Sequence, residues 1–513
     1  MTIKVFSIGL KGLEGYKVQV EVQMTPGKES MIIVGLPDAS VKESKERVLS
    51  TLRSLECDVT DQKIVVNLSP SEQKKNGPLF DLAMAVGLLK ESGHVNVVIP
   101  NTVAFIGALS LDGDVEKVEG MLPALIAANK LGFTRVYVPY DPLIPFEMLE
   151  GFECIVVKHI NEVLQHLNGK EMLPYFIERE QIVDHEEVHH EYHKDFSDII
   201  GHEQAKEALE IAAAGEHNVL MSGPPGCGKS LLAETFPSIL PRLSKQAQME
   251  VMSLYQIAKE PQISTQIPPY RHPHHSASSV AIIGGGSQPK PGEISLAHRG
   301  VLFLDEMAEF SKKTLDMLRQ PLETGKVTIS RAHSTVTYPA SFILIAAMNP
   351  CPCGYYGSNS HYCICTPKNI QTYRRRVSGP IYDRFDIFLS LQSVNLNRPS
   401  TTAETSSAIR KRVEAAREKQ YSRYEEAICN AKVPLERLFA KSPLTEHQRK
   451  MIAQISSKQH WSNRVEIKII RLARTIADLA GEHNIPDEAI WKAITLRRPN
   501  LLTEQTNIRK GVR

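Results

Sequence analysis

The chain has no run of about 18 consecutive apolar residues, which is the length a membrane-spanning helix requires. Its first residues lack the signal-peptide pattern of a basic stretch followed by an apolar one. The formal net charge is only +2, so no overall basic field marks the chain as a binder of nucleic acid, although a local basic surface stays open. We therefore expect a cytoplasmic protein with no membrane partner.

Short internal repeats and low-complexity tracts are also lacking. The composition is ordinary, with 42% hydrophobic and 23% charged residues, which argues for folded globular domains. A chain of 513 residues exceeds what a single core can organise, so about two to four domains are expected. In the cytoplasm, the eight cysteines are expected to be reduced thiols or metal ligands rather than disulfides.

Sequence patterns divide the chain into three blocks and a linker. Residues 1–175 alternate strand-like and helix-like stretches, which predicts an α/β domain. Residues 176–194 are polar and rich in Glu and His, which predicts a linker; a metal site on its histidines is the less favoured alternative. Residues 195–395 hold the nucleotide motifs, and residues 396–513 show helical periodicity that predicts an all-helical domain.

The most informative motif is GPPGCGKS at residues 223–230, a complete GxxxxGK[ST] phosphate-binding loop between an apolar strand and a helical stretch. Its glycines let backbone N–H groups face phosphates, and the helix start adds partial positive charge. Lys229 is expected to reach the β- and γ-phosphates, and the Ser230 hydroxyl to bind Mg²⁺. The predicted nucleotide-binding residues are Gly223, Pro224, Pro225, Gly226, Cys227, Gly228, Lys229 and Ser230.

Two further apolar strands end in polar residues. Residues 301–304 lead into Asp305 and Glu306, and we assign Asp305 to Mg²⁺ and Glu306 to polarising the attacking water. Residues 341–348 lead into Asn349, which we expect to orient that water. A simple turn residue before the following proline is the alternative for this asparagine.

An arginine from a neighbouring subunit can stabilise the charge that develops on a transferred phosphoryl group. Four arginines follow the Asn349 strand, at residues 374–376 and at Arg384, and their positions alone do not decide which takes this role. The need for an arginine in trans predicts a ring of identical subunits with nucleotide between neighbours.

The order and spacing of these motifs resemble those of AAA+ ATPases. Longer stretches are similar to magnesium-chelatase-like proteins of the YifB/ComM family, over nearly the whole chain: YRHPHHSASSVAIIGGGSQPKPGEISLAHRGVLFLDEM, LRQPLETGKVTISRA and AAMNPCPCGYYG. The resemblance implies that Arg384 is the arginine finger, that Arg464 is the second-sensor arginine on the lid of its own subunit, and that residues 195–209 pack against adenine. It also implies ATP and Mg²⁺ as ligands and, typically, a hexameric ring.

The same resemblance implies a branch-migration helicase that serves recombination in natural transformation, with DNA and recombination proteins as partners. The alternative is a chelatase-type ATPase that drives metal insertion or remodels a protein partner. Chelatase ATPase subunits lack the N-terminal domain and the four-cysteine loop of this chain, which favours the DNA motor. Intact Glu306, Asn349 and Arg384 disfavour a purely structural ATP-binding regulator.

A long insertion separates the phosphate loop from the Asp305 strand. Its glycine-rich segments 283–286 and 289–292 predict the tips of a hairpin. Similarity to chelatases and MCM helicases implies that this hairpin faces the ring pore, where Arg271 and Lys290 would contact DNA phosphates. A structured histidine-rich loop without DNA contact is the alternative.

Half of the cysteines fall within 15 residues just beyond Asn349, at Cys351, Cys353, Cys363 and Cys365. Four thiolates suit tetrahedral Zn²⁺ and leave no open position for catalysis. The C-x-C spacing is tighter than the usual C-x₂-C. We expect a structural zinc site, with reduced free thiols as the alternative.

The N-terminal block is similar to the proteolytic domain of Lon proteases in NLSPSEQKKNGPLFDLAMAVGLL and FIGALSLDGDVEKVEGMLPALIAANKLGFTRVYVP. That family uses a serine nucleophile and a lysine base, but the matching positions here are Leu79 and, approximately, Leu122. We therefore expect a Lon-like fold without protease activity, serving binding or ring assembly. At Lys74 and Lys75, a solvated turn is favoured over a phosphate site. The predicted fold class is α/β and multidomain: a Lon-like domain, an AAA+ core and a helical lid.

Overall fold

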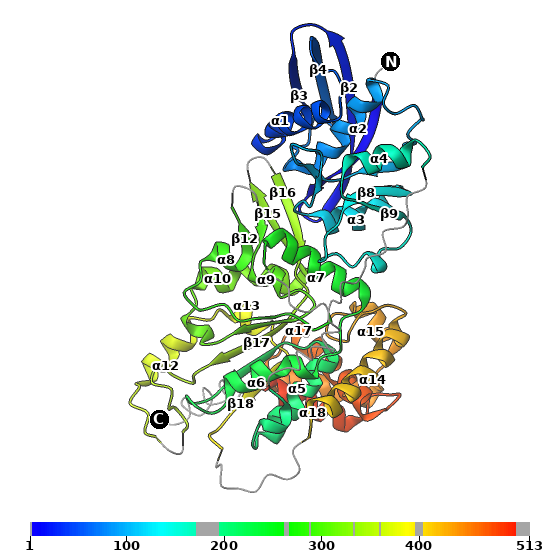
Figure 1. Cartoon of the computed structure of the whole chain (residues 1–513). Helices are drawn as coiled ribbons and strands as arrows, with labels where there is room; N and C mark the ends of the chain where they lie inside the picture. Colours follow the sequence, from blue (N-terminus) through cyan, green and yellow to red (C-terminus); the bar gives the residue numbers. More distant parts are fainter. Residues whose placement is uncertain are drawn as a thin grey trace, which may run out of the picture. The chain divides into compact units, whose positions relative to one another are not determined.

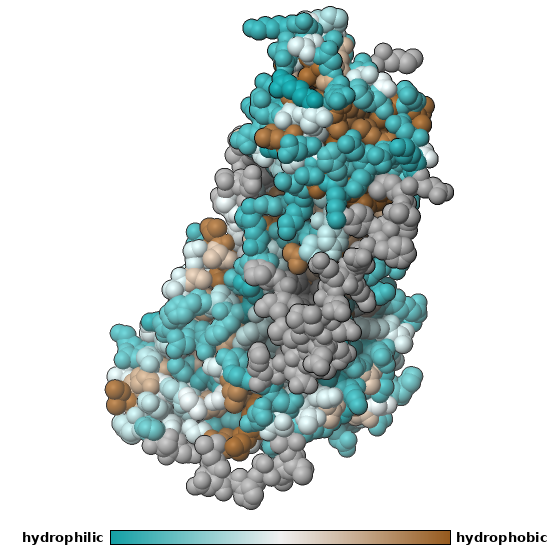
Figure 2. All heavy atoms as spheres, in the orientation of Figure 1, coloured by the Kyte–Doolittle hydropathy of each residue, from teal (hydrophilic) through white to brown (hydrophobic). Residues whose placement is uncertain are grey.

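The computed structural model describes residues 3–170, 194–260, 266–286, 289–331, 334–358, 361–394 and 404–498. Two compact units emerge from it (Figure 1): the first holds the described residues within 1–186, 249–263 and 330–337, and the second holds the other described residues. The predicted linker lies outside the described residues, except for Lys194. The described part of the chain contains no helix long and apolar enough to span a bilayer. The face seen in Figure 2 is mainly hydrophilic, with apolar residues in scattered groups.

The first unit is built on a seven-stranded sheet of order β3-β4-β2-β1-β5-β8-β9. Strand β2 pairs antiparallel with β1 and β4, whereas β5, β8 and β9 continue the sheet in parallel. Helices α2 and α3 pack against β1 and β2. The sheet strands and helices are β1 (Ile3–Lys11), β2 (Glu14–Pro26), β3 (Ser30–Val34), α1 (Ala39–Ser54), β4 (Gln62–Ser69), α2 (Asp81–Glu91), β5 (Val103–Phe105), α3 (Met121–Lys130), β8 (Arg135–Pro139), β9 (Glu153–Val157) and α4 (Ile160–Leu167).

A small hairpin, β6 (Ala108–Leu109) with β7 (Val115–Glu116), completes the unit. The α/β character predicted for the first block is confirmed. Leu79 and Leu122, which stand at the positions of the Lon serine and lysine, are 5% and 1% exposed and belong to the apolar core. Neither side chain offers a nucleophile or a base.

The solvated turn predicted for Lys74 and Lys75 is wrong for Lys75. Its side chain is fully buried, and its ammonium donates to the Pro70 carbonyl. Backbone hydrogen bonds from Lys75 N–H to Leu36 O (3.1 Å) and from Asp38 N–H to Lys75 O (3.0 Å) draw this loop against the segment after β3, which covers the side chain. Lys74, in contrast, is exposed.

The second unit is built on a five-stranded parallel sheet of order β11-β14-β17-β10-β18. Every residue of β10, β14 and β17 is buried, as expected for parallel strands with both faces covered. The strands are β10 (Val219–Ser222), β11 (Tyr270–Arg271), β14 (Val301–Leu304), β17 (Ile343–Met348) and β18 (Ile387–Ser390).

The helices of this unit that precede the C-terminal block are α5 (Glu203–Gly215), α6 (Lys229–Thr235), α8 (Ser279–Ile283), α9 (Glu293–Leu296), α10 (Lys312–Met317), α11 (Arg319–Thr324), α12 (Pro367–Arg374) and α13 (Gly379–Tyr382). Helix α7 (Lys245–Ala258) follows α6 in the chain but belongs to the first unit from Met249 onward. The two glycine-rich segments of the insertion form one antiparallel hairpin, β12 (Gly284–Gly285) with β13 (Lys290–Pro291). Gly284 takes φ +104°, and a Cβ there would lie 2.4 Å from the Lys290 carbonyl oxygen, so this tip requires glycine. A second hairpin pairs β15 (Lys326–Arg331) with β16 (Ser334–Pro339), and its outer part, within segment 330–337, belongs to the first unit.

The C-terminal block is helical, and it shares one hydrophobic core with the parallel sheet. Its helices are α14 (Ser406–Tyr424), α15 (Leu435–Lys441), α16 (Glu446–Gln459), α17 (Asn463–Ala480) and α18 (Asp487–Arg497). Helices α14 and α17 pack against α5, and α18 packs against β18. Arginines of α14 stabilise this packing: Arg412 binds Glu210, and Arg417 donates to the Ala213 carbonyl.

Candidate active site

The residues predicted to bind nucleotide gather at one edge of the parallel sheet. Strand β10 leads into the phosphate loop, β14 leads into Asp305 and β17 leads into Asn349. Because β17 lies between β10 and β14 and all three are parallel, their carboxyl ends meet at the same edge. Ligands of open α/β sheets bind outside the carboxyl ends of the strands.

Hydrogen bonds connect the phosphate loop to both neighbouring strands. The Ser230 hydroxyl donates to Asp305 Oδ2 at 3.0 Å, and Lys229 Nζ donates to Asn349 Oδ1 at 3.2 Å. Lys229 Nζ also donates to the carbonyls of Gly223 (2.7 Å) and Pro224 (2.9 Å). These three acceptors hold the Lys229 ammonium inside the loop, and its burial there lowers the pKa of Lys229.

The donor set at this edge fits a nucleotide with Mg²⁺. Gly226 and Gly228 take φ of +74° and +86°, the left-handed region that glycine adopts without strain, and such turns aim successive N–H groups at an anion. Ser230 and Asp305 present a hydroxyl and a carboxylate side by side, and Mg²⁺ prefers oxygen ligands. These two residues would hold the metal ion.

Glu306 stands directly beyond Asp305 in a left-handed conformation with φ 47° and ψ 44°. Such a conformation is costly for a residue with a Cβ and is concentrated at functional sites. The backbone N–H of Glu306 donates to Asp305 Oδ1 at 2.8 Å, while its own side chain is 53% exposed. Its carboxylate Oε2 lies 3.6 Å from His275 Nδ1, so the insertion contributes a residue to the site.

Two histidines of this site were not predicted from the sequence. His275 was considered only as part of a histidine-rich loop, and its pairing with Glu306 joins residues 31 positions apart. His202 precedes α5 with φ 60°, and its imidazole interacts with the Cys227 backbone of the phosphate loop, while burial lowers its pKa. The signal for His202 was its place in residues 195–209, which the family resemblance assigned to the nucleotide site.

Arg384 lies at the opposite edge of the sheet from the phosphate loop. Strands β10 and β18 are paired from Val219↔Ile387 to Ser222↔Ser390, so Arg384 precedes the amino end of β18 while the loop follows the carboxyl end of β10. Four strand residues span about 13 Å. Arg384 is 8% exposed, binds the Glu323 carboxylate and has a buried Nε without a hydrogen-bond partner among the described residues.

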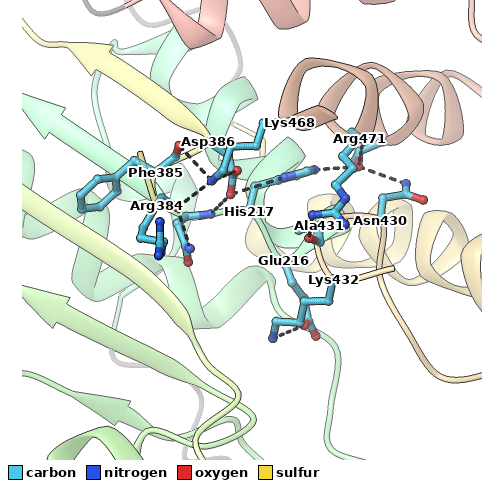
Figure 3. Close-up of polar contacts among 12 residues, drawn as sticks. Glu216, His217, Arg384, Phe385, Asp386, Asn430, Ala431, Lys432, Lys468 and Arg471 are labelled. Atoms are coloured by element: carbon cyan, nitrogen blue, oxygen red, sulfur yellow. Dashed lines mark hydrogen bonds and ion pairs between the residues drawn. The ribbon is translucent and has the colours of Figure 1, made fainter. Parts of the chain in front are cut away.

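Arg464 is exposed near the start of α17. Four residues later, about 6 Å along the helix, Lys468 Nζ donates to the Arg384 carbonyl at 2.9 Å (Figure 3). The backbone of Arg464 therefore lies about one helical turn from the contact of Lys468 with Arg384 at the amino edge of the sheet.

The two basic residues predicted for DNA contact differ in their surroundings. Arg271 forms two hydrogen bonds with Glu293, of 2.6 and 2.7 Å, so its guanidinium stabilises the link between β11 and α9. Lys290 is exposed on the β12–β13 hairpin. Contact of Arg271 with a phosphate backbone stays a prediction, and it would have to share the guanidinium with the Glu293 carboxylate.

The four cysteines beyond Asn349 converge. The sulfur atoms of Cys351, Cys353, Cys363 and Cys365 all lie within 4.8 Å of one another, and three of the separations are 3.4, 3.7 and 3.6 Å. A tetrahedron with Zn–S bonds of about 2.3 Å has edges of about 3.8 Å, so the arrangement fits a Cys₄ zinc site.

This cysteine loop touches the phosphate loop. Gly354 takes φ +85°, and a Cβ there would lie 2.7 Å from Pro225 Cδ. Cys351, the first cysteine, stands two residues after Asn349 and is fully buried. The cysteine loop is thus packed against one nucleotide-binding segment and is continuous with another.

Comparisons with known proteins agree over the whole chain. Residues 195–398 match the family "Magnesium chelatase, subunit ChlI", residues 20–142 match "Subunit ChlI of Mg-chelatase" and residues 403–497 match "Magnesium chelatase, subunit ChlI C-terminal". The chain is 36% identical to YifB of Escherichia coli over 491 residues, 95% of each chain. It is 36% identical to competence protein ComM of Haemophilus influenzae over 500 residues, 96% of this chain and 97% of ComM.

A shorter match supports the predicted Lon likeness. The chain is 30% identical to Lon protease 2 of Bacillus subtilis over 180 residues, which cover 32% of each protein. The likeness predicted for the N-terminal block is confirmed, as are the α/β fold class and the resemblance to magnesium-chelatase-like proteins.

Substitution of Glu306 by glutamine tests its assignment to the attacking water. Glu306→Gln keeps the size of the side chain but removes the base, so nucleotide binding is expected to persist while turnover falls about 10²–10⁴-fold. Steady-state ATP hydrolysis and binding of a fluorescent nucleotide measure the two effects. Glu309→Gln is the matched control: Glu309 lies three residues after Glu306 and binds Arg376. This variant is expected to keep turnover. Unchanged hydrolysis in Glu306→Gln would remove this residue from the mechanism.

Proposed function

The chain belongs to the YifB/ComM family of magnesium-chelatase-like AAA+ ATPases, and on that basis we propose that it hydrolyses ATP as a ring of identical subunits acting on DNA. In this proposal, Lys229 neutralises the β- and γ-phosphates, while Ser230 and Asp305 hold Mg²⁺. Bound Mg²⁺ supplies further neutralisation of phosphate charge. Glu306 polarises the attacking water, and Asn349, which is within 3.2 Å of Lys229 Nζ, orients it.

The main support for a ring of subunits is the separation of Arg384 from the phosphate loop of its own subunit. The length of β10, about 13 Å, separates the edge that carries Arg384 from the edge that carries the phosphate loop, which disfavours contact between this arginine and the nucleotide of its own subunit. A second copy that presents its amino edge to the loop would supply the arginine, as arginine fingers do. A closed ring repeats this contact at every subunit, and a hexamer is the number typical of the AAA+ fold that the chain resembles.

The position of Arg464 supports a change in its assignment. The family resemblance implied that it senses nucleotide from the lid of its own subunit. Its location one helical turn before Lys468, at the amino edge of the sheet, instead supports contact with the nucleotide of the neighbouring subunit, alongside Arg384.

Mixed rings test the arginine in trans. Arg384→Ala is expected to reduce turnover by about 10³-fold or more, because the developing charge on the phosphate loses its partner. Lys229→Ala subunits lack a working phosphate loop but keep Arg384. Combining the two inactive variants is expected to restore part of the hydrolysis, since some Arg384→Ala sites then face an intact arginine. If mixing restores nothing while both variants assemble, the assignment in trans fails.

Two observations support action on DNA: the similarity of the chain to ComM, and the exposed Lys290 on the hairpin. The chain is similar over its whole length to the competence protein ComM, and competence is the capacity for transformation by DNA. Lys290 on the β12–β13 hairpin is available to a phosphate backbone. We therefore favour branch migration in recombination, in the cytoplasm and with recombination proteins as partners. The first unit, which has leucines at the Lon catalytic positions, would serve binding or ring assembly.

A chelatase-type motor is the second candidate, because the three matching families are named for the magnesium chelatase subunit ChlI. Such a motor would drive metal insertion or remodel a protein. DNA-dependent stimulation of ATP hydrolysis separates the two functions. We expect branched or single-stranded DNA to raise turnover at about 50 mM salt and to lose this effect toward 200 mM, because phosphate contacts weaken steeply with salt.

Lys290→Ala is expected to weaken this stimulation without changing hydrolysis in the absence of DNA. Absence of any stimulation at low salt would favour the chelatase-type function.

We also propose that the cysteine loop binds one structural Zn²⁺ through all four thiolates. Support comes from the spacing of the sulfur atoms, which fits a tetrahedral ion, and from the closed Cys₄ donor set. The ion would hold Cys351 and Cys353 against Cys363 and Cys365 and so fix the loop that begins just after Asn349.

Elemental analysis tests the zinc site. The purified protein is expected to carry about one zinc per chain, and Cys363→Ser to lose it, because three thiolates bind the ion far more weakly than four. Cys154→Ser, at a cysteine on β9 far from the loop in sequence, is the matched control and is expected to keep the metal. A folded, metal-free wild-type preparation would contradict the proposal.

A further inference from the structure

A buried carboxylate stands where the lid helices meet the amino edge of the parallel sheet (Figure 3). Asp386, the last residue before β18, is 6% exposed. Its Oδ2 accepts a hydrogen bond from the Asn218 backbone N–H at 2.9 Å, and its Oδ1 accepts one from Lys468 Nζ at 2.6 Å. His217 Nδ1 lies 3.8 Å from Oδ2. The carboxylate thus joins β18, the start of β10 and helix α17.

Lys468 binds more than this carboxylate. Its ammonium also donates to the carbonyl oxygens of Arg384 at 2.9 Å and of Phe385 at 3.3 Å. An ammonium has three protons, and here they are directed to three consecutive residues of one segment. Arg497 of α18 donates to the same Phe385 carbonyl. The segment that carries Arg384 is therefore held by two lid helices.

The charges at this point are strongly coupled. Burial alone would raise the pKa of the Asp386 carboxyl, but the Lys468 ammonium outweighs that effect and holds the pKa well below its usual range. Burial in turn lowers the pKa of Lys468, and Asp386 opposes that shift. Removing either partner would leave the other charge buried and unpaired, so the lid cannot leave this edge of the sheet without a large energetic cost.

We propose that Lys468 is a positioning residue for Arg384: it fixes the backbone of residues 384–386 to helix α17, so that Arg384 and Arg464 act on the neighbouring nucleotide as one body. This inference rests on the proposed function, in which Arg384 works in trans. It adds a residue that contacts no nucleotide. A movement of the lid would then displace the arginine that the next subunit's hydrolysis requires.

The geometry distinguishes this role from simple lid attachment. The lid is also attached to the sheet's helices at exposed ion pairs such as Lys492 with Glu207, which lie far from Arg384 in sequence. Lys468 differs from these ion pairs because it binds the backbone carbonyl of Arg384 itself. The side chain of Asn218, at the start of the sheet strand β10, donates to the same carbonyl at 3.1 Å. The peptide group after the arginine therefore has its orientation set by one lid residue and one sheet residue.

The first test compares two lysine variants of the full-length ring. Lys468→Met keeps an unbranched side chain but removes the charge and all three hydrogen bonds. Turnover is expected to fall about 10–100-fold, which is the cost of misplacing a catalytic group by about 1 Å. The KM for ATP is expected to stay within about twofold, because the phosphate loop lies at the opposite edge. Lys492→Met, which breaks the exposed pair with Glu207, is expected to change neither quantity.

The second test combines variants. In an Arg384→Ala background, Lys468→Met is expected to cause less than about a twofold further loss, because it acts through an arginine that is already absent. Mixed rings of Lys468→Met with Lys229→Ala subunits are expected to regain turnover, since the latter present a correctly held Arg384. A further full loss in the Arg384→Ala background would show that Lys468 acts only on structure, and would overturn the proposal.

Two outcomes separate this inference from the proposed function. If Arg384→Ala abolishes turnover while folded Lys468→Met keeps it, the positioning role fails and the trans arginine stands. If Arg384→Ala keeps turnover, the trans arginine itself fails. Should Lys468→Met not fold, Asp386→Asn replaces it, because an amide oxygen still accepts from Asn218 N–H while the ion pair is lost. Asp386→Asn alone is then expected to lower turnover as Lys468→Met would. Added to Arg384→Ala, it is expected to cause less than about a twofold further loss.

Discussion

The common direction of the five strands in the second unit is the constraint on which the active site depends. Because the sheet is parallel, all carboxyl ends meet at one edge and all amino ends at the other. Lys229, Ser230, Asp305 and Asn349 follow carboxyl ends, whereas Arg384 precedes an amino end. The two sets of residues therefore lie at opposite edges of one subunit, and the proposed mechanism needs a second subunit to bring Arg384 to a phosphate loop.

Asn218 is the residue that organises the amino edge. Its side chain accepts from the Leu344 N–H at 2.8 Å and donates to the Arg384 carbonyl at 3.1 Å, which connects β17 to the segment before β18. Its backbone N–H binds Asp386, and its carbonyl accepts from the backbone N–H of Asp386 at 2.9 Å. Strand β10 begins at the next residue and ends at the phosphate loop. One four-residue strand thus connects the lid attachment to the nucleotide.

Local patterns were readable from the sequence, and long-range pairings were not. The phosphate loop and the α/β character of the first block follow from spacing and periodicity within short segments. Arg384 binds Glu323, and Glu306 lies beside His275. In both pairs the partner comes from a different element, and sequence periodicity carries no information on such contacts. Arg271 and Lys75 have partners that the sequence around each of them does not reveal. Each reads as an exposed cation in its own segment, yet a distant chain segment buries Lys75 and a carboxylate 22 residues away binds Arg271.

The close approach of Gly354 to Pro225 makes the conformations of the cysteine loop and the phosphate loop depend on each other. Any side chain at position 354 would adopt a left-handed backbone conformation and would also overlap the proline ring 2.7 Å away. A side chain at position 354 would fit only if the phosphate loop shifted at Pro225. The two segments lie 129 positions apart in the sequence, yet a displacement of the cysteine loop would be felt directly by a segment that binds the nucleotide.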